Sequence, residues 1–184
     1  GQGAGTVLSF ADNLEVSAAH VETIYNLFSG VGVERATMSE LSIIGGKNNE
    51  DVYEVGINLT DSNQCNISNV WINNVTSSGI RTIYCDRVNI DGAVVRNCED
   101  YGIYLINTSS SDVSSCAATR CRVGIYVLAI PNSNAPSNAK SVTITGGKYT
   151  YNRWNGILFY WAESCTINGA TAYGNGQLFD NSQD

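Results

Sequence analysis

Residues 88–103 read VNIDGAVVRNCEDYGI, and this stretch decides the fold. Apolar and polar residues alternate in its first part, Val88-Asn89-Ile90, as they do in a strand with one buried face. The stretch ends on the dipeptide Gly102-Ile103, which recurs at Gly56-Ile57, Gly79-Ile80, Gly124-Ile125 and Gly156-Ile157. The successive intervals are 23, 23, 22 and 32 residues. A period of this size indicates stacked structural units.

Three further sets of residues keep the same period and form columns of like side chains. The first column is aliphatic and contains Ile43, Ile67, Ile90, Val113, Ile144 and Ile167. The second is small or branched and contains Val70, Ala93, Cys116, Gly147 and Ala170. The third is mixed and contains Ile72, Val95, Ala118, Tyr149 and Ala172. Coils stacked at the strand spacing of about 4.8 Å would pair each strand with the coils above and below it. The sequence therefore predicts an all-β chain folded as a right-handed single-stranded parallel β-helix, a solenoid whose coils have about 22–23 residues.

The same pattern predicts the domain organisation. We expect one β-helix domain over 1–184, with an irregular first coil over 1–35 and repeat coils over 36–179. The long last interval contains residues 129–139, which include both prolines, Pro131 and Pro136. We interpret this segment as a loop inserted into one coil, a change that repeat architectures tolerate.

Charge and hydropathy exclude several classes of partner. The formal net charge is −7, and no basic stripe is present, so we expect no nucleic-acid binding. No apolar run approaches the roughly 18–20 residues that span a bilayer, so we expect no membrane insertion.

The six cysteines are predicted to fill the interior as small apolar side chains. They are Cys65, Cys85, Cys98, Cys116, Cys121 and Cys165. None forms Cys-x-x-Cys, and the one histidine, His20, lies far from them in sequence, so we predict no metal site and no cofactor. Disulfides remain an alternative. Calcium also stays open, although we interpret the acidic pair Glu99-Asp100 as ordinary turn residues.

Alternation also predicts which side chains leave the helix after each Gly-Ile pair. Two outward columns result: Asn58, Arg81, Tyr104, Tyr126 and Leu158; and Thr60, Ile83, Ile106, Leu128 and Tyr160. The second column is apolar over four coils, and an exposed apolar and aromatic strip marks an interaction site. The opposing interpretation is that the strip turns inward at a bend or lies under the 129–139 loop.

We assign two sets of candidate residues to this face. The candidate sugar-binding residues are Arg81, Tyr104, Tyr126 and Tyr160, since aromatic rings stack on pyranose rings and the Arg81 fork suits a carboxylate. The candidate subunit-interface residues are Ile83, Ile106, Leu128 and Trp161, since interfaces are rich in aromatic side chains.

Two segments carry a family resemblance. The stretch SVTITGGKYTYN (141–152), with Gly156-Ile157 and YGNG (173–176), resembles the catalytic module of alginate (mannuronan) epimerases, and GAGTVL (3–8) resembles that family's entry strand. The pattern is shared with pectate-lyase-like proteins. The resemblance implies a parallel β-helix that acts on a uronate-containing polysaccharide.

The epimerase catalytic motif itself is not found. The family's Tyr-Gly-Phe-Asp-Pro-His corresponds to YGIYLI (101–106), where Tyr104 replaces the Asp and Ile106 replaces the His. Proton abstraction beside a carboxylate needs a base and a group that neutralises the developing charge. Whether the chain is an enzyme therefore stays open, with a lyase that uses Arg81 as base as one alternative.

Two functions follow from these observations. The first is a β-helix that binds or processes an extracellular polysaccharide. Its expected protein partner is either a second copy of the chain, in a homo-oligomer, or a covering domain. The alternative is a structural oligomeric module, such as a phage tail-spike or stalk segment, without enzymatic activity. We expect an extracellular or virion-associated location.

Overall fold

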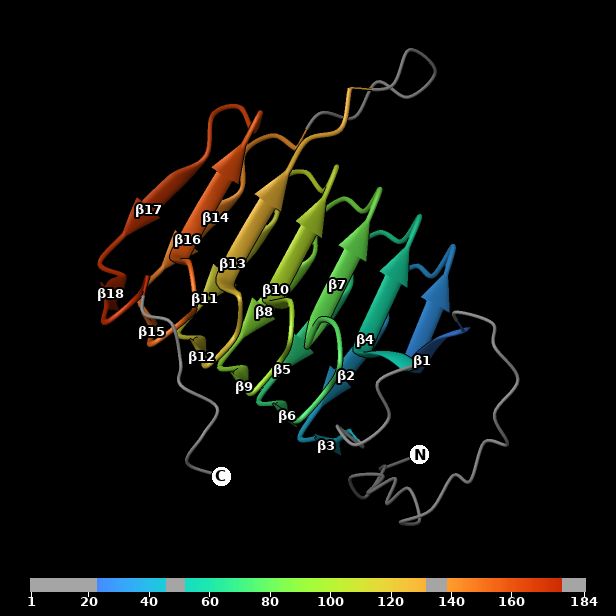
Figure 1. The fold of residues 1–184 in the computed structure, drawn as a ribbon. Coiled ribbons are helices and arrows are strands. Elements are labelled where there is room, and N and C mark those ends of the chain that lie inside the picture. The colour runs from blue at the N-terminus through green and yellow to red at the C-terminus, as the bar shows by residue number, and fades with distance from the viewer. Residues whose placement is uncertain (1–22, 46–51, 132–138, 177–184) are drawn as a thin grey trace.

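The chain folds into a parallel β-helix, as a computed structural model shows (Figure 1). The structure describes residues 23–45, 52–131 and 139–176. Within these ranges eighteen strands lie in three six-stranded sheets, and every strand pair is parallel. The predicted fold class, a right-handed parallel β-helix, is confirmed.

Each coil contributes one strand to each sheet, so that strands of successive coils lie side by side (Figure 1). Sheet A contains β1 (Thr23–Val31), β4 (Val52–Thr60), β7 (Ile80–Ile83), β10 (Tyr101–Ile106), β13 (Val123–Leu128) and β16 (Asn155–Tyr160). Sheet B contains β2 (Thr37–Ser39), β5 (Asn66–Ser68), β8 (Asn89–Asp91), β11 (Asp112–Ser114), β14 (Thr143–Thr145) and β17 (Thr166–Asn168). Sheet C contains β3 (Ser42–Ile44), β6 (Trp71–Asn73), β9 (Val94–Arg96), β12 (Ala117–Thr119), β15 (Lys148–Thr150) and β18 (Thr171–Tyr173).

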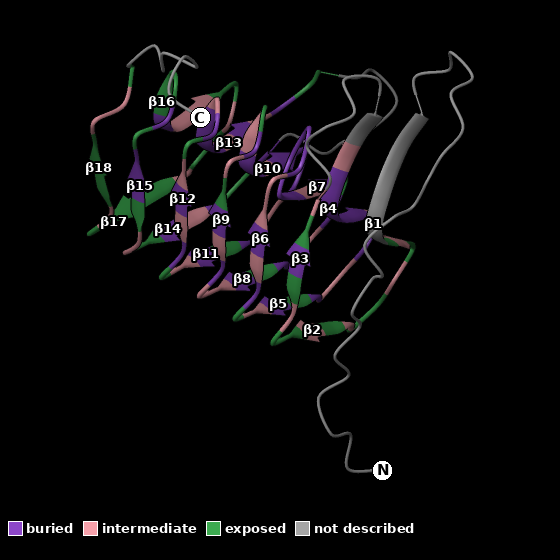
Figure 2. Cartoon of the chain, turned by 60° about the horizontal axis from the view of Figure 1, so that its bottom comes forward, coloured by how far each residue is buried: buried purple, intermediate pink, exposed green. Residues whose placement is uncertain are grey.

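Alternation along the strands produces a continuous apolar interior. The middle residue of nearly every three-residue strand up to β15 is buried while its neighbours are more exposed, as Figure 2 shows. Stacked equivalents such as Ile67, Ile90 and Val113 are at most 1% exposed. No coil can cover this apolar face alone, so neighbouring coils share the stabilisation.

Close packing explains why a Gly-Ile pair recurs in successive coils. The isoleucines stack in register, Ile57, Ile80, Ile103, Ile125 and Ile157. The glycines lie where sheet A starts close to the interior side chains of sheet C. A Cβ on Gly102 would lie 2.6 Å from the Ala118 Cβ and 2.6 Å from the Gly124 carbonyl oxygen. Only hydrogen fits in that space, so glycine recurs once per coil.

The corners of each coil are turned by single residues in the left-handed region. At four recurring positions the backbone has a positive φ, with non-glycine values between 44° and 59°. Examples from the four positions are Asp61, Tyr84 and Asn107; Gln64, Arg87 and Ser110; Asn69, Gly92 and Ser115; and Asn74, Asn97 and Arg120. Asparagine and glycine occupy this region at the lowest cost, and both recur at these corners, as at Asn69, Gly92 and Asn97.

The strand register tests the sequence columns. The column with Ile72, Val95 and Ala118 is confirmed, and Ile43 is its first member. The assignment of Ile43 to the column of Ile67 was wrong, since Met38 pairs with Ile67. Two consecutive short strands, β2 and β3, have the same pattern, and spacing alone chose the wrong one.

Two predicted segments lie partly outside the described residues. Residues 1–22 of the expected irregular first coil are not described, while β1, within 1–35, pairs with β4 as the first strand of sheet A. Residues 132–138 of the expected loop insertion are likewise not described. Its flanks, Ala129 and Ala139, are buried at 2% and 0% exposure. The described residues include no helix of the length and apolarity that a membrane span requires.

Candidate functional site

The outer face of sheet A carries the first predicted outward column. Asn58, Arg81, Tyr104, Tyr126 and Leu158 stack in register on β4, β7, β10, β13 and β16. Their neighbours in sequence, such as Ile80 and Ile103, are fully buried, so these side chains leave the helix. The alignment predicted from the Gly-Ile period is therefore correct, and it brings Arg81, Tyr104 and Tyr126 together.

Three tyrosines form an aromatic platform on this face. The rings of Tyr104 and Tyr126 are stacked, with centroids 5.2 Å apart and planes inclined by 2°. Tyr101 completes the platform, with its centroid 4.4 Å from that of Tyr104 and 5.2 Å from that of Tyr126. Sequence reasoning missed Tyr101 because it precedes the Gly-Ile pair and so lies outside both outward columns.

Arg81 is the cation beside the platform. Its Nε donates a hydrogen bond of 2.8 Å to the Asn58 Oδ1, and Asn58 is 5% exposed. Burial lowers the pKa of the Arg81 guanidinium from its usual value, and the neighbouring Tyr104 opposes this shift. Arginine nevertheless stays charged in proteins. Within the described part of the chain Arg81 forms no ion pair, so a half-buried positive charge faces outward beside the rings.

The platform hydroxyls are donors rather than bases. Burial raises the pKa of Tyr104 well above its usual value of 10.0; the neighbouring Tyr101 and Tyr126 raise it further, and Arg81 lowers it. Burial also raises the pKa of Tyr126. Both phenols are therefore protonated at neutral pH and available to donate hydrogen bonds.

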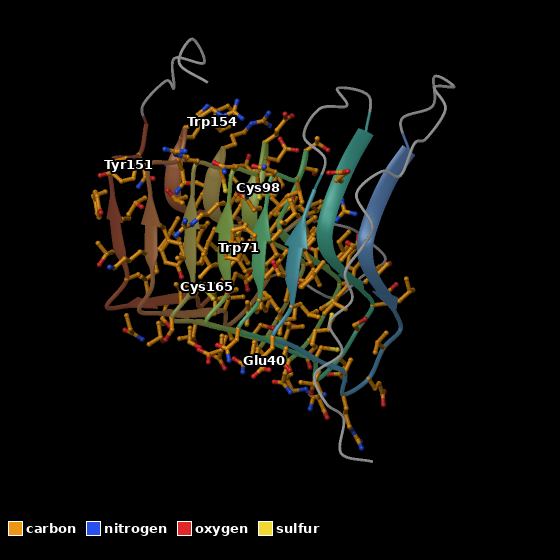
Figure 3. The ribbon with its side chains drawn as sticks, turned by 90° about the horizontal axis from the view of Figure 1, so that it is seen from below. Glu40, Trp71, Cys98, Tyr151, Trp154 and Cys165 are labelled. Atoms are coloured by element: carbon orange, nitrogen blue, oxygen red, sulfur yellow. The ribbon has the colours of Figure 1, made fainter. Side chains whose placement is uncertain are left out.

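An ion pair lies directly before β10 and β13, between Asp100 and Arg122. The Arg122 Nη1 lies 2.8 Å from the Asp100 Oδ1, and Ser77 donates to the other carboxylate oxygen at 3.4 Å. The Arg122 guanidinium lies 5.2 Å from the centroid of the Trp154 ring, which is 58% exposed and is labelled in Figure 3. Asp100, of the acidic pair considered for calcium, is thus paired with a cation. These corner residues were missed because alternation does not extend through a turn.

The second outward column is less exposed than the sequence predicted. Thr60, Ile83, Ile106, Leu128 and Tyr160 stack in register as expected. Ile106 is only 9% exposed, and Ile83 and Leu128 are half-buried, so the prediction of an exposed apolar strip was wrong for Ile106.

The far end of that column remains open. Tyr160 is 47% exposed and lies in the column of Leu128, one column away from Tyr126. Its ring centroid is 4.8 Å from that of Trp161, which is 61% exposed. Tyr160 therefore joins Trp161 rather than the platform. The interface role of Trp161, Ile83, Ile106 and Leu128 stays a prediction.

The cysteines lie in the interior. All six are free, and five of them are buried, with Cys165 half-buried. Burial raises the pKa of Cys98 well above 9.0, with a further contribution from the neighbouring Cys121, and burial raises the pKa of Cys116 to about 12. Over the described ranges no group of three His, Cys, Asp or Glu side chains converges. His20 lies outside those ranges.

The fold is similar to solved structures of one enzyme. A double mutant of the periplasmic alginate epimerase AlgG matches with a TM-score of 0.56 and 15% identity, covering 82% of this chain and 36% of that chain. A single mutant of the same epimerase matches with a TM-score of 0.46 and 10% identity, covering 82% of this chain and 49% of that one. The chain thus spans less than half the length of these proteins. At such identities the likeness shows the β-helix fold alone.

Sequence comparison identifies a family. No curated protein matches the chain. The family model described as periplasmic copper-binding protein (NosD) matches residues 2–138, which is more than half of the sequence and includes the platform strands β7, β10 and β13. The chain belongs to the NosD family.

Proposed function

We propose that this chain binds an acidic polysaccharide along the outer face of sheet A. The observation that carries the proposal is the alignment of a half-buried cation, Arg81, with the stacked rings of Tyr104 and Tyr126 on three successive coils. The phenol groups at the outer edge of the stacked rings suit hydrogen bonds to sugar hydroxyl groups, and the arginine fork binds a carboxylate through two hydrogen bonds.

The geometry of the stack favours an extended ligand. Successive coils repeat at about 4.8 Å, which is close to the length of one pyranose residue in a chain. A glycan that runs along the β-helix axis would therefore present one sugar to each coil. The phenol groups of Tyr104 and Tyr126 would donate to sugar hydroxyl groups.

Binding without turnover fits the groups on this face. The positions that correspond to the epimerase Asp and His hold Tyr104 and Ile106. Tyr104 has a raised pKa and is a poor base, and Ile106 is buried. Asp100 is held by Arg122. General acid–base chemistry needs a group whose pKa lies near the working pH; the raised pKa of Tyr104 moves it away from that range, and Ile106 carries no titratable group.

The family description names copper, and the described residues do not fit that ion. Copper sites in proteins use thiolate, thioether and imidazole ligands that converge on one point. Here Cys98 and Cys116 are buried thiols with raised pKa values, which disfavour the thiolate. No trio of His, Cys, Asp or Glu side chains converges in the part of the chain that the structure describes. We therefore derive no function through copper.

The family description also names the periplasm. This supports an exported location for the chain, where it would meet extracellular or cell-wall polysaccharide. A virion-associated location and a homo-oligomeric stalk remain alternative expectations, and light scattering coupled to size-exclusion chromatography tests the second directly.

Calorimetric titration with defined oligosaccharides tests the proposal. Tyr104→Ala removes the central ring and should weaken binding by about tenfold, which corresponds to roughly 1.4 kcal/mol. Tyr173→Ala is the matched control, because Tyr173 is 52% exposed on sheet C, away from the platform. Circular dichroism melts should show both variants folded. Equal loss in the two variants, or no binding of any acidic or neutral glycan by the native chain, would refute the proposal.

A further inference from the structure

We infer that the preferred ligand is a heteropolysaccharide in which an isolated carboxylate-bearing sugar is flanked by uncharged sugars, rather than a homopolymer of uronates. The inference rests on the proposed function and specifies the substrate class of the same face. It follows from the distribution of charge over the sheet.

Arg81 is alone as a charge on the platform strands. The strands β7, β10, β13 and β16 read IRTI, YGIYLI, VGIYVL and NGILFY, and Arg81 is their one charged residue. The residues stacked after it in the column are Tyr104, Tyr126 and Leu158. A ligand with one sugar per coil would place one carboxylate at Arg81 and its next sugars on uncharged side chains.

Asn58 prepares Arg81 for a single carboxylate. Its Oδ1 accepts the hydrogen bond from the Arg81 Nε at 2.8 Å, and its burial at 5% exposure fixes this contact. The Nη groups of Arg81 are then left for a ligand. A planar fork held along one edge suits bidentate recognition of a carboxylate. Asn58 is thus a positioning residue for the acidic sugar.

The remaining surroundings disfavour further carboxylates. Asp100 and Arg122, which precede β10 and β13, form an ion pair with each other at 2.8 Å. A uronate placed against Tyr104 or Tyr126 would lose water without gaining a cation, which is costly for a charged group. The formal net charge of −7 adds a general repulsion of dense polyanions. Uncharged rings suit these two positions better.

Competition among three ligands tests the inference. Calorimetry at one fixed ionic strength compares gellan oligosaccharides, in which one glucuronate alternates with three neutral sugars, with oligomannuronate and with cello-oligosaccharides of matched length. The native chain should bind the alternating ligand about tenfold more tightly than either of the others, a difference of roughly 1.4 kcal/mol. Tighter or equal binding of oligomannuronate would overturn the inference.

Two variants make the test specific to charge. Asn58→Asp places a carboxylate against Arg81 and should remove the preference for the alternating ligand over the neutral one. Leu158→Lys adds a second cation to the column and should raise the affinity for oligomannuronate relative to the alternating ligand. If the native chain binds neutral and acidic glycans equally, this inference fails and a glycan-binding role survives. If it binds none of the three, both fail.

Discussion

Replacing Gly102 with alanine tests why the Gly-Ile period exists. The φ of Gly102 is not in the left-handed region, so alanine could adopt the backbone there. Without a packing conflict, Gly102→Ala would stabilise the fold by about 0.4–1 kcal/mol, because the unfolded chain loses conformational freedom. In the structure the new methyl group would lie 2.6 Å from the Ala118 Cβ and 2.6 Å from the Gly124 carbonyl oxygen. Contacts this short require the sheets to move apart.

Overpacking of this kind costs about 1–3 kcal/mol, which exceeds the entropic gain. We therefore expect Gly102→Ala to lower the free energy of unfolding by about 1.3 kcal/mol, the difference between the midpoints of these two ranges, about 2 and about 0.7 kcal/mol. Urea denaturation at constant temperature measures this as a lower midpoint with an unchanged slope.

A double-mutant cycle with Ala118→Gly identifies the cause. Removing the Ala118 Cβ relieves one of the two short contacts, so the double variant should recover about 1 kcal/mol relative to the sum of the single changes. Additive effects, or a Gly102→Ala variant as stable as the native chain, would contradict the close-approach explanation and leave the recurrence of glycine without a packing cause.

Three further outcomes follow from interior polar groups. Tyr149→Phe should leave the free energy of unfolding unchanged or raise it by up to about 1 kcal/mol, because the buried Tyr149 hydroxyl has no hydrogen-bond partner within the described ranges. A clearly lower melting temperature of the variant would show that the hydroxyl does have a partner. Asn152→Ala should cost about 3 kcal/mol in urea denaturation, because the Asn152 amide accepts from the Cys121 N–H at 3.0 Å and donates to the Ala118 carbonyl at 3.2 Å; a loss below 1 kcal/mol would argue against these bonds. Burial raises the pKa of Cys116 from 9.0 to about 12, so the unfolded thiol ionises first and stability falls as the pH rises from 9 towards 12. Cys116→Ala should flatten that part of the stability–pH curve, and an unchanged slope would assign it to other groups.

The fold was predictable because its determinants are local and repeat. Alternation indicated strands such as those at Val88-Asn89-Ile90 and Val142-Thr143-Ile144, and the Gly-Ile period gave the register of sheet A. The error at Ile43 has a simple origin. Ile43 and Ile67 are 24 residues apart (67 − 43), close to the regular period, whereas Ile43 and its true partner Ile72 are 29 apart (72 − 43). This coil contains extra residues before β4, and the similar strands β2 and β3 hid the shift.

The site was predictable only where it follows strand alternation. Arg81, Tyr104 and Tyr126 lie on strands, and the register brought them together. Tyr101 and the pair Asp100–Arg122 lie at the start of sheet A and in its corner, where side-chain direction depends on the turn. The burial of Ile106, at 9% exposure, could not be read from strand alternation, which gives the direction of a side chain and not how much of it is covered.

Because equivalent strands stack in register, the β-helix can be shortened by whole coils. Asn89 and Asp112 occupy equivalent places on β8 and β11, so excision of residues 89–111 would join Val88 to Asp112 and remove one complete turn of the solenoid. The column would then run from Arg81 directly to Tyr126, and the molecule would be shorter by about 4.8 Å. The distance between the cation and the last platform ring is thus a variable that can be engineered in steps of one coil, without redesign of any individual strand.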